Sequence, residues 1–110
     1  MPLTVEFIRE SVANGDYEIS LHADEERLAE ALTVEQIEDV LKQAELLEDY
    51  PEDRRGHSCL VLGYSASQPV HVVCGRTRSG RLIVITIYTP SMPKWVDERT
   101  RNREEDANGR

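Results

Sequence analysis

Three apolar segments in the second half of the chain constrain its fold more than any other feature. They are rich in valine, isoleucine and leucine, are separated by short breaks, and span residues 58–64, 70–77 and 81–88. The second break contains Ser79-Gly80, a dipeptide that favours a tight turn. Segments of this length and spacing predict three antiparallel strands joined as a meander. A fourth, shorter strand is expected over Glu45–Tyr50, where Pro51 ends it.

The first half of the chain has the periodicity of helices. A first apolar stripe, ended by Asn14-Gly15, consists of Leu3, Phe7, Ile8 and Val12. Tyr17–Ile19 reads as extended, and Ser20 is a good N-cap for a helix over His22–Ala31. The spacing of Thr33 and Gln36 predicts a capping box, and the stripe that follows it consists of Ile37, Val40, Leu41 and Ala44. This order predicts an α+β domain, with N-terminal helices packed on a three- to four-stranded antiparallel sheet.

A chain of 110 residues is long enough for one domain with a single core. We expect residues 1–96 to form it, with residues 91–96 folding back so that Trp95 is buried. Residues 97–110 are polar, which predicts a flexible C-terminal tail. No apolar run reaches the roughly 18 residues that span a bilayer, and Met1–Glu6 does not resemble a signal peptide. We therefore expect a cytoplasmic protein without membrane contact, either a monomer or a small homo-oligomer.

The net charge of −8 is distributed unevenly along the chain. Residues 1–55 contain five basic and 16 acidic side chains, whereas residues 56–110 contain eight basic and five acidic ones. The strand half is therefore basic, and nucleic acid responds to a local basic patch as well as to the total charge. The alternative is that the acidic helices are simply well solvated.

Two registers are open for the hairpin at Ser79-Gly80. A two-residue turn places His71 opposite Tyr88 and Val73 opposite Thr86, whereas a three-residue turn with a bulge shifts the pairing by one. We prefer the first register because it separates polar from apolar residues on the two sheet faces. It predicts one core formed by Ile37, Leu41, Val72, Cys74, Ile83, Ile85 and Ile87.

Cys59 and Cys74 are too few, and too differently placed, for a cysteine zinc motif. They can lie close together if their strands pair, and two buried free thiols are the expected state in a reducing compartment. The three histidines lie far apart in the sequence, so we expect no metal site and no cofactor.

Several short motifs, taken as a set, resemble the bacterial family called domain of unknown function 4258. They are Ser20-Leu21-His22-Ala23 with Glu26-Arg27, then Tyr50–Asp53, Ser58–Gly63, His71–Val73 and Ile85–Pro90. That family is in turn similar to the compact RelE, BrnT and MqsR-type toxin ribonucleases. The resemblance implies a RelE-like fold and a metal-independent ribonuclease toxin of a bacterial type II toxin–antitoxin pair, with RNA as substrate and a small antitoxin as partner. The chain departs from those toxins in being acidic.

A metal-independent ribonuclease needs a proton acceptor, a proton donor and cations for the phosphate. On this logic His71 and Tyr88 are the first catalytic candidates, with His22 and Arg27 close by if the second helix begins at the sheet edge. The expected substrate-binding side chains are Arg76, Arg78, Thr86 and Lys94.

Structural roles compete with each of these assignments. His22 can bind a neighbouring strand, Arg27 can pair with Asp24, and Tyr88 can anchor a strand end. The competing function is a non-catalytic protein-binding module with the same fold, which uses its acidic helical face.

Overall fold

The computed structural model describes residues 3–102. In chain order these residues form α1 (Val5–Ala13), β1 (Tyr17–Ile19), α2 (Leu21–Ala29), α3 (Val34–Lys42), β2 (Glu45–Tyr50), β3 (Ser58–Ser65), β4 (Gln68–Arg76) and β5 (Leu82–Tyr88). The hydroxyls of Thr4, Ser20 and Thr33 accept backbone N–H groups and begin the three helices. Thr33 and Gln36 form the predicted capping box, so local capping chemistry sets the helix starts.

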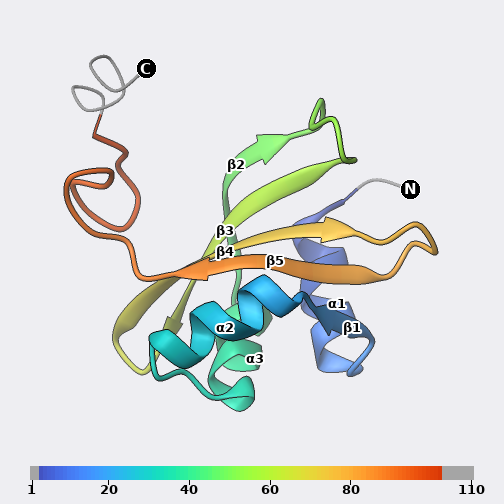
Figure 1. Ribbon diagram of the computed structural model, residues 1–110, viewed down its shortest axis with the longest axis horizontal. Coiled ribbons are helices and arrows are strands. Elements are labelled where there is room, and N and C mark those ends of the chain that lie inside the picture. The colour runs from blue at the N-terminus through green and yellow to red at the C-terminus, as the bar shows by residue number, and fades with distance from the viewer. Residues whose placement is uncertain (1–2, 103–110) are drawn as a thin grey trace.

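The sheet is mixed and has five strands in the order β1-β5-β4-β3-β2. Strands β2 to β5 are antiparallel neighbours, and the helices lie below them in Figure 1. The expectation of three or four antiparallel strands is corrected by β1. Its residues Tyr17–Ile19 pair in parallel with Leu82–Val84 and occupy the outer edge of β5. The α+β class is confirmed.

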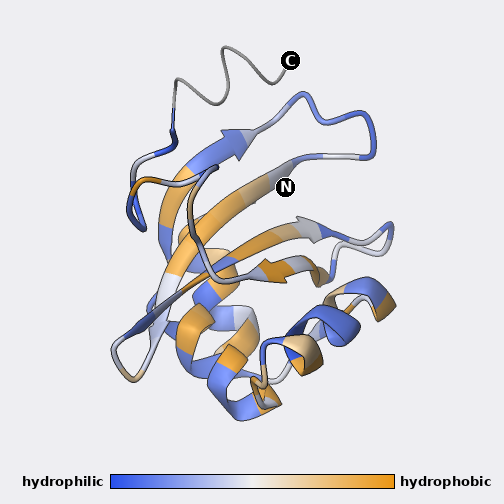
Figure 2. Ribbon diagram, turned by 60° about the vertical axis from the view of Figure 1, so that its left-hand side comes forward, coloured by the Kyte–Doolittle hydropathy of each residue, from blue (hydrophilic) through white to orange (hydrophobic). Residues whose placement is uncertain are grey.

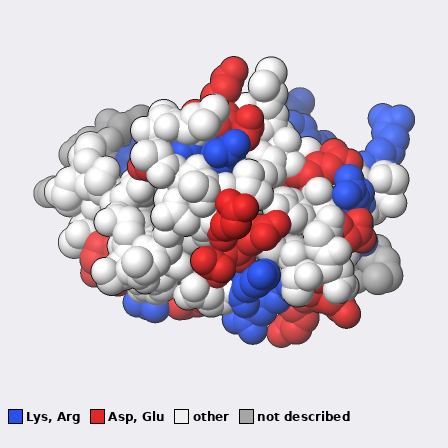
Figure 3. Space-filling view, turned by 90° about the horizontal axis from the view of Figure 1, so that it is seen from below, with Lys and Arg blue, Asp and Glu red and all other residues white. Residues whose placement is uncertain are grey.

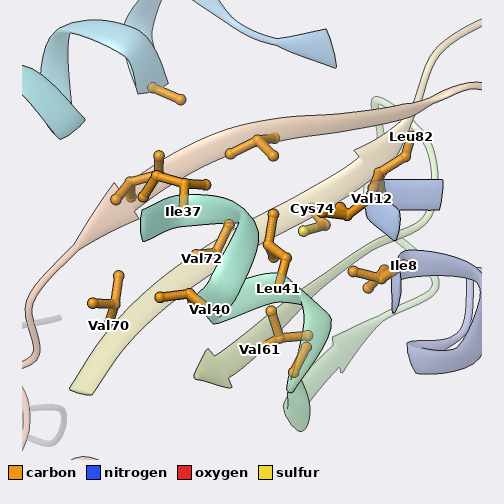
Figure 4. Packing of buried hydrophobic residues seen from close by; sticks show 14 of the residues in the cluster. Ile8, Val12, Ile37, Val40, Leu41, Val61, Val70, Val72, Cys74 and Leu82 are labelled. Atoms are coloured by element: carbon orange, nitrogen blue, oxygen red, sulfur yellow. The ribbon is translucent and has the colours of Figure 1, made fainter. Parts of the chain in front are cut away.

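The core lies between the sheet and the helices α1 and α3. Figure 4 shows Ile8 and Val12 from α1, with Ile37, Val40 and Leu41 from α3, pointing at side chains of β3 and β4. The middle strands are apolar along most of their length, whereas the end of β2 is hydrophilic and each helix is apolar on one side only (Figure 2). Helix α3 approaches β3 very closely at Gly63, where a Cβ atom would lie 2.1 Å from the carbonyl oxygen of Val40. Glycine is therefore required there.

Helix α2 is attached to β5 mainly by polar contacts. Ala23 is its only buried residue, and Glu26 accepts the backbone N–H of Ile87 at 2.9 Å. The Ser20 hydroxyl donates to the carbonyl of Ile85 at 3.1 Å, and Thr89 donates to Glu30 at 2.7 Å. These side chains satisfy the outer edge of β5 beyond the end of β1.

The β4–β5 hairpin combines both predicted registers. Near the turn, Arg76 pairs with Leu82 and Cys74 with Val84, as a three-residue turn requires. Ile85 is then an extra residue in β5, a β-bulge that restores the pairs Val73–Thr86 and His71–Tyr88.

This bulge corrects part of the predicted core. Leu82 and Val84 join the core in place of Ile83 and Ile85, which lie on the opposite face of the sheet. The core positions predicted at Ile37, Leu41, Val72, Cys74 and Ile87 are confirmed.

After β5 the chain folds back over the sheet. Residues 91–102, here called the strap, include the buried Trp95. We expected the tail to begin at residue 97, but Arg99 and Arg101 bind Glu45 and Glu48 of β2 through paired hydrogen bonds of 2.8–3.1 Å. The rest of the expected tail, residues 103–110, lies outside the described residues. Among residues 3–102, no helix has the length and apolar character needed to cross a bilayer.

Candidate functional site

The sheet face opposite the helices is divided into a covered half and an open half. The strap covers the half that contains His71. Trp95 packs edge-on against the His71 ring with 4.5 Å between ring centroids, and the Arg101 guanidinium lies 4.6 Å from the Trp95 ring centroid. A backbone bridge between Trp95 and Arg101 closes the strap on itself.

His71 is completely buried beneath this strap. Its Nε2 lies 2.7 Å from the carbonyl oxygen of Glu98, and its Nδ1 lies 3.0 Å from the Tyr88 hydroxyl. Because a carbonyl only accepts, Nε2 carries the hydrogen and Nδ1 accepts from Tyr88. Burial lowers the pKa of His71 and favours the neutral ring. The predicted pairing with Tyr88 is confirmed, but both ring nitrogens already have partners and no ligand reaches them past Trp95.

Tyr88 is part of the same covered cluster. Burial raises the pKa of its hydroxyl, and the side chain of Trp95 forms a hydrogen bond with it. Lys94, a predicted substrate contact, lies in the strap and lines a separate small pocket between Tyr88 and Trp95. The contacts of Tyr88 and Trp95 with each other and with His71 hold the strap on the sheet.

The open half of the face contains a cleft of about 530 Å³. We call it the sheet cleft, and its lining residues are Ser20, His22, Tyr50, Asp53, Arg55, Ser58, Val73, Ile85 and Thr86. It continues towards the β4–β5 turn past His57, Gly75, Thr77 and Ile83. At its far end lie Arg55, Gly56, His57, Arg76, Thr77 and Arg78. Its walls are therefore the start of α2, the β2–β3 loop and the β4–β5 turn.

The floor of the sheet cleft is apolar at its centre. Gly75 of β4 pairs with Ser58 on one side and Ile83 on the other. A Cβ atom at Gly75 would lie 2.9 Å from the terminal methyl carbon of Ile85. The Ile85 side chain therefore lies over Gly75 and, together with Val73 and Ile83, makes this part of the cleft surface apolar.

Two histidines stand at the walls of this cleft. His22 is 67% exposed and its Nε2 lies 3.1 Å from a Glu26 oxygen. His57, which sequence analysis did not select, lies 2.6 Å from Asp49. A signal for His57 was present, since it ends the charged loop Asp53–His57, but its partner Asp49 is on the strand before that loop. Each accessible imidazole therefore has a carboxylate partner.

The remaining predicted residues fall in different places. Thr86 lies beside His22 in the cleft, and Arg78 lies at its far end. Arg76 lines that end too, but its guanidinium stacks 3.9 Å above the Phe7 ring of α1. Arg27 does not line the cleft; it binds Asp24 at 2.7 Å and the carbonyl of Leu32 at 3.0 Å. Its contacts fix the end of α2, as the structural interpretation of Arg27 predicts.

Asp53 is an anion on the wall of the sheet cleft. Its Oδ1 accepts the N–H of Arg55 at 3.0 Å, and its Oδ2 accepts the Ser58 hydroxyl at 2.8 Å. These bonds lower the pKa of its carboxyl group. The Arg55 guanidinium is 86% exposed and lies 3.6 Å from Asp53, so it remains open to a ligand. Within residues 3–102, no three His, Cys, Asp or Glu side chains gather closely enough to hold a metal ion.

Residues 19–89 match the model of the family described as Domain of unknown function (DUF4258). This chain belongs to that family. The match contains every lining residue of the sheet cleft, whereas the strap begins after it ends. No curated protein and no solved structure matches the chain. The family assignment thus points to the cleft rather than to the strap, without naming an activity.

Proposed function

We propose that this family member binds RNA in the sheet cleft and cleaves it without a metal ion. The observation that supports this most strongly is the pair of accessible histidines, His22 and His57, which line two adjoining parts of the sheet cleft. Each has a carboxylate partner that can orient its ring. The proposal moves the acid–base role from His71 to these two side chains.

Two imidazoles supply what the reaction needs. In metal-independent cleavage the ribose 2′-oxygen attacks the adjacent phosphorus and the 5′-oxygen of the next nucleotide leaves. One imidazole takes the 2′-hydroxyl proton, and the other, in its protonated form, gives a proton to the leaving oxygen. The products are a 2′,3′-cyclic phosphate and a free 5′-hydroxyl. General acid–base groups of this kind contribute roughly 10²–10⁴-fold each to the rate.

The phosphate charge is met by arginines at the far end of the cleft. Arg55 and Arg78 project from the two loops that form this end. Guanidinium groups bind phosphate oxygens in pairs and stabilise charge that develops in the transition state. A local basic site of this kind can act within a chain of net charge −8, although RNA binding should weaken steeply with salt.

The similarity to RelE, BrnT and MqsR-type toxins extends the proposal to a toxin–antitoxin pair. It rests on fold-level analogy, which does not by itself define activity. A neutralising protein partner has a surface available on α2, where Leu21 and Leu28 are 76% and 62% exposed. Figure 3 shows acidic side chains gathered at the centre of this helical side. The same surface supports the alternative of a non-catalytic protein-binding module.

Cleavage of a fluorogenic RNA oligonucleotide tests the proposal. The wild type is expected to cleave it in the presence of EDTA and to leave the all-deoxy version intact. His22→Gln and His57→Gln should each lower kcat/KM roughly 10²-fold or more, with the thermal midpoint nearly unchanged. Growth arrest on induced expression in bacteria, lost in the same variants, tests the toxin assignment.

Lys42→Gln is the matched control for a lost cation, because Lys42 is exposed in the last turn of α3 on the helical side. Arg55→Gln should weaken RNA cleavage, whereas Lys42→Gln should not. An inactive wild type across a range of salt concentrations would contradict the ribonuclease proposal and leave the protein-binding module.

A further inference from the structure

The sheet cleft combines a flat apolar floor with a single ionised carboxylate. The floor consists of Val73, Ile83 and Ile85, and the Ile85 side chain lies over Gly75. Asp53 stands at its wall next to Ser58, which pairs directly with Gly75 in the sheet. A planar ring can lie on these aliphatic side chains, and its edge would then face the carboxylate.

Asp53 is unsuited to contact a phosphate group. It is negatively charged, and its two oxygens act only as acceptors while they bind the N–H of Arg55 and the hydroxyl of Ser58. Oδ2 retains a further lone pair, and Oδ1 has one as well when the exposed Arg55 guanidinium beside it turns to the phosphate, so the carboxylate can accept from two more donors. Its place in a phosphate-binding cleft is explained if its partner is a base rather than the backbone.

We propose, building on the RNA-cleaving function above, that Asp53 makes the sheet cleft selective for guanine. Guanine alone presents two adjacent donors, N1–H and N2–H, that match the two oxygens of a carboxylate. The base lies on Val73, Ile83 and Ile85 with this edge towards Asp53. Its 3′-phosphate then extends to Arg55 and Arg78, and the cut falls after the guanosine.

The other bases present fewer hydrogen-bond donors to a carboxylate. Cytosine and adenine have one amino donor next to a ring acceptor, which repels an oxygen anion, and uracil has one donor between two carbonyls. A site built to bind specific donors rejects bases that lack them, because buried polar groups are then left unpaired. The preference for guanine should therefore reach at least about tenfold in kcat/KM.

Four oligonucleotides test this inference, each with one ribonucleotide, G, A, C or U, in an otherwise deoxy strand. The wild type is expected to cleave after G at least about tenfold faster than after the other three. Asp53→Asn replaces one acceptor by a donor and keeps the size, so the ratio of G to A cleavage should fall about tenfold or more. Asp39→Asn, the same change on the exposed side of α3, should leave the ratio unchanged.

Further outcomes distinguish guanine selectivity from a general effect of Asp53 on the loop structure and from catalysis itself. Equal rates after all four ribonucleotides, or an Asp53→Asn variant that slows all four alike, would overturn the guanine assignment while leaving the ribonuclease in place. If no oligonucleotide is cut, calorimetry tests the guanine site directly. It measures the binding of 3′-GMP, 3′-AMP, 3′-CMP and 3′-UMP. Selective binding of 3′-GMP that Asp53→Asn abolishes keeps the guanine site although the proposed activity has failed. Equal or absent binding overturns it.

Discussion

At the scale of single residues, His71 shows how burial changes the role that a histidine side chain can have. Its neutral form donates to the Glu98 carbonyl and accepts from Tyr88, and Trp95 seals it from solvent. Protonation would turn the accepting nitrogen into a second donor and leave the Tyr88 hydroxyl without its acceptor. The side chain therefore contributes to stability in one protonation state only.

This arrangement predicts that the protein loses stability as the pH falls below the ordinary histidine pKa of about 6.5. Burial lowers the pKa of His71 in the folded state, although the nearby Glu48 and Glu98 favour protonation and Arg101 opposes it. The unfolded chain then binds the proton first, so the free energy of unfolding decreases from pH 7 towards pH 5.5. Urea titrations at a series of pH values measure this slope.

His71→Gln is the variant to compare, because glutamine forms hydrogen bonds but does not titrate. Its free energy of unfolding should be lower at pH 7 and should change less between pH 7 and 5.5. Equal slopes for the two proteins would mean that His71 does not titrate differently on folding. His71→Ala should lose roughly 2–4 kcal/mol at neutral pH, from the cavity and the unpaired Tyr88.

The two cysteines are expected to be unreactive in the folded protein. Cys59 and Cys74 face each other across β3 and β4 inside the core and are free thiols. Burial raises the pKa of Cys59 to about 12 and that of Cys74 well above its ordinary value, so almost no thiolate is present. A thiol-specific chromogenic reagent should label neither in buffer and both in 6 M guanidinium chloride. Rapid labelling of the native protein would contradict the burial of this pair.

The residue scale also shows where sequence reasoning stops. Alternation along β4 and β5 correctly placed His71 beside Tyr88, on the face away from the helices. Nothing in that pattern shows that Trp95 and Glu98, more than 20 positions along the chain, return to cover it. His57 was not selected for a similar reason, because its contact with Asp49 can be recognised only in the folded structure.

At the scale of elements, the bulge at Ile85 decides which half of β5 joins the core. Leu82 is completely buried against the helices, whereas Ile85 is partly exposed in the sheet cleft. Leu82→Ala should therefore lower the free energy of unfolding by roughly 2–5 kcal/mol. Ile85→Ala should lower it by less than half as much, as chemical denaturation can measure. Equal losses would place both side chains in one core and remove the bulge.

Elements with local signals were predictable, and those that depend on distant partners were not. Thr33 with Gln36, and Ser20, define helix starts within four residues. By contrast, the three residues of β1 become a strand only because Leu82–Val84 lie beside them. The bulge likewise has no signal in β5, where five successive β-forming residues suit either register.

At the scale of the whole molecule, the strap is part of the domain rather than an appendage. It covers His71 and the fully buried Leu62 next to it in the sheet, and Trp95 is itself only 3% exposed. A chain that ends at Pro90 should therefore expose an apolar sheet face. We expect it to bind the dye ANS and to unfold at a lower temperature or fail to fold.

A chain that ends at Asn102 is the control for this truncation, because it retains the ion pairs of Arg99 and Arg101 with β2. If the chain that ends at Pro90 behaves in the same way as this control, the strap does not stabilise the sheet.

The pairing of β1 with β5 has a consequence for how the protein is made. A ribosome delivers Tyr17–Ile19 long before Leu82–Val84, so the first strand to leave it has no partner until β5 is synthesised. Helix α2 cannot dock before β5 is present either, because Glu26 and Ser20 bind Ile87 and Ile85. Translation that stops before residue 82 therefore leaves α2 undocked and the open edge of β4 available to other chains. The sheet can therefore close only after β5 has left the ribosome.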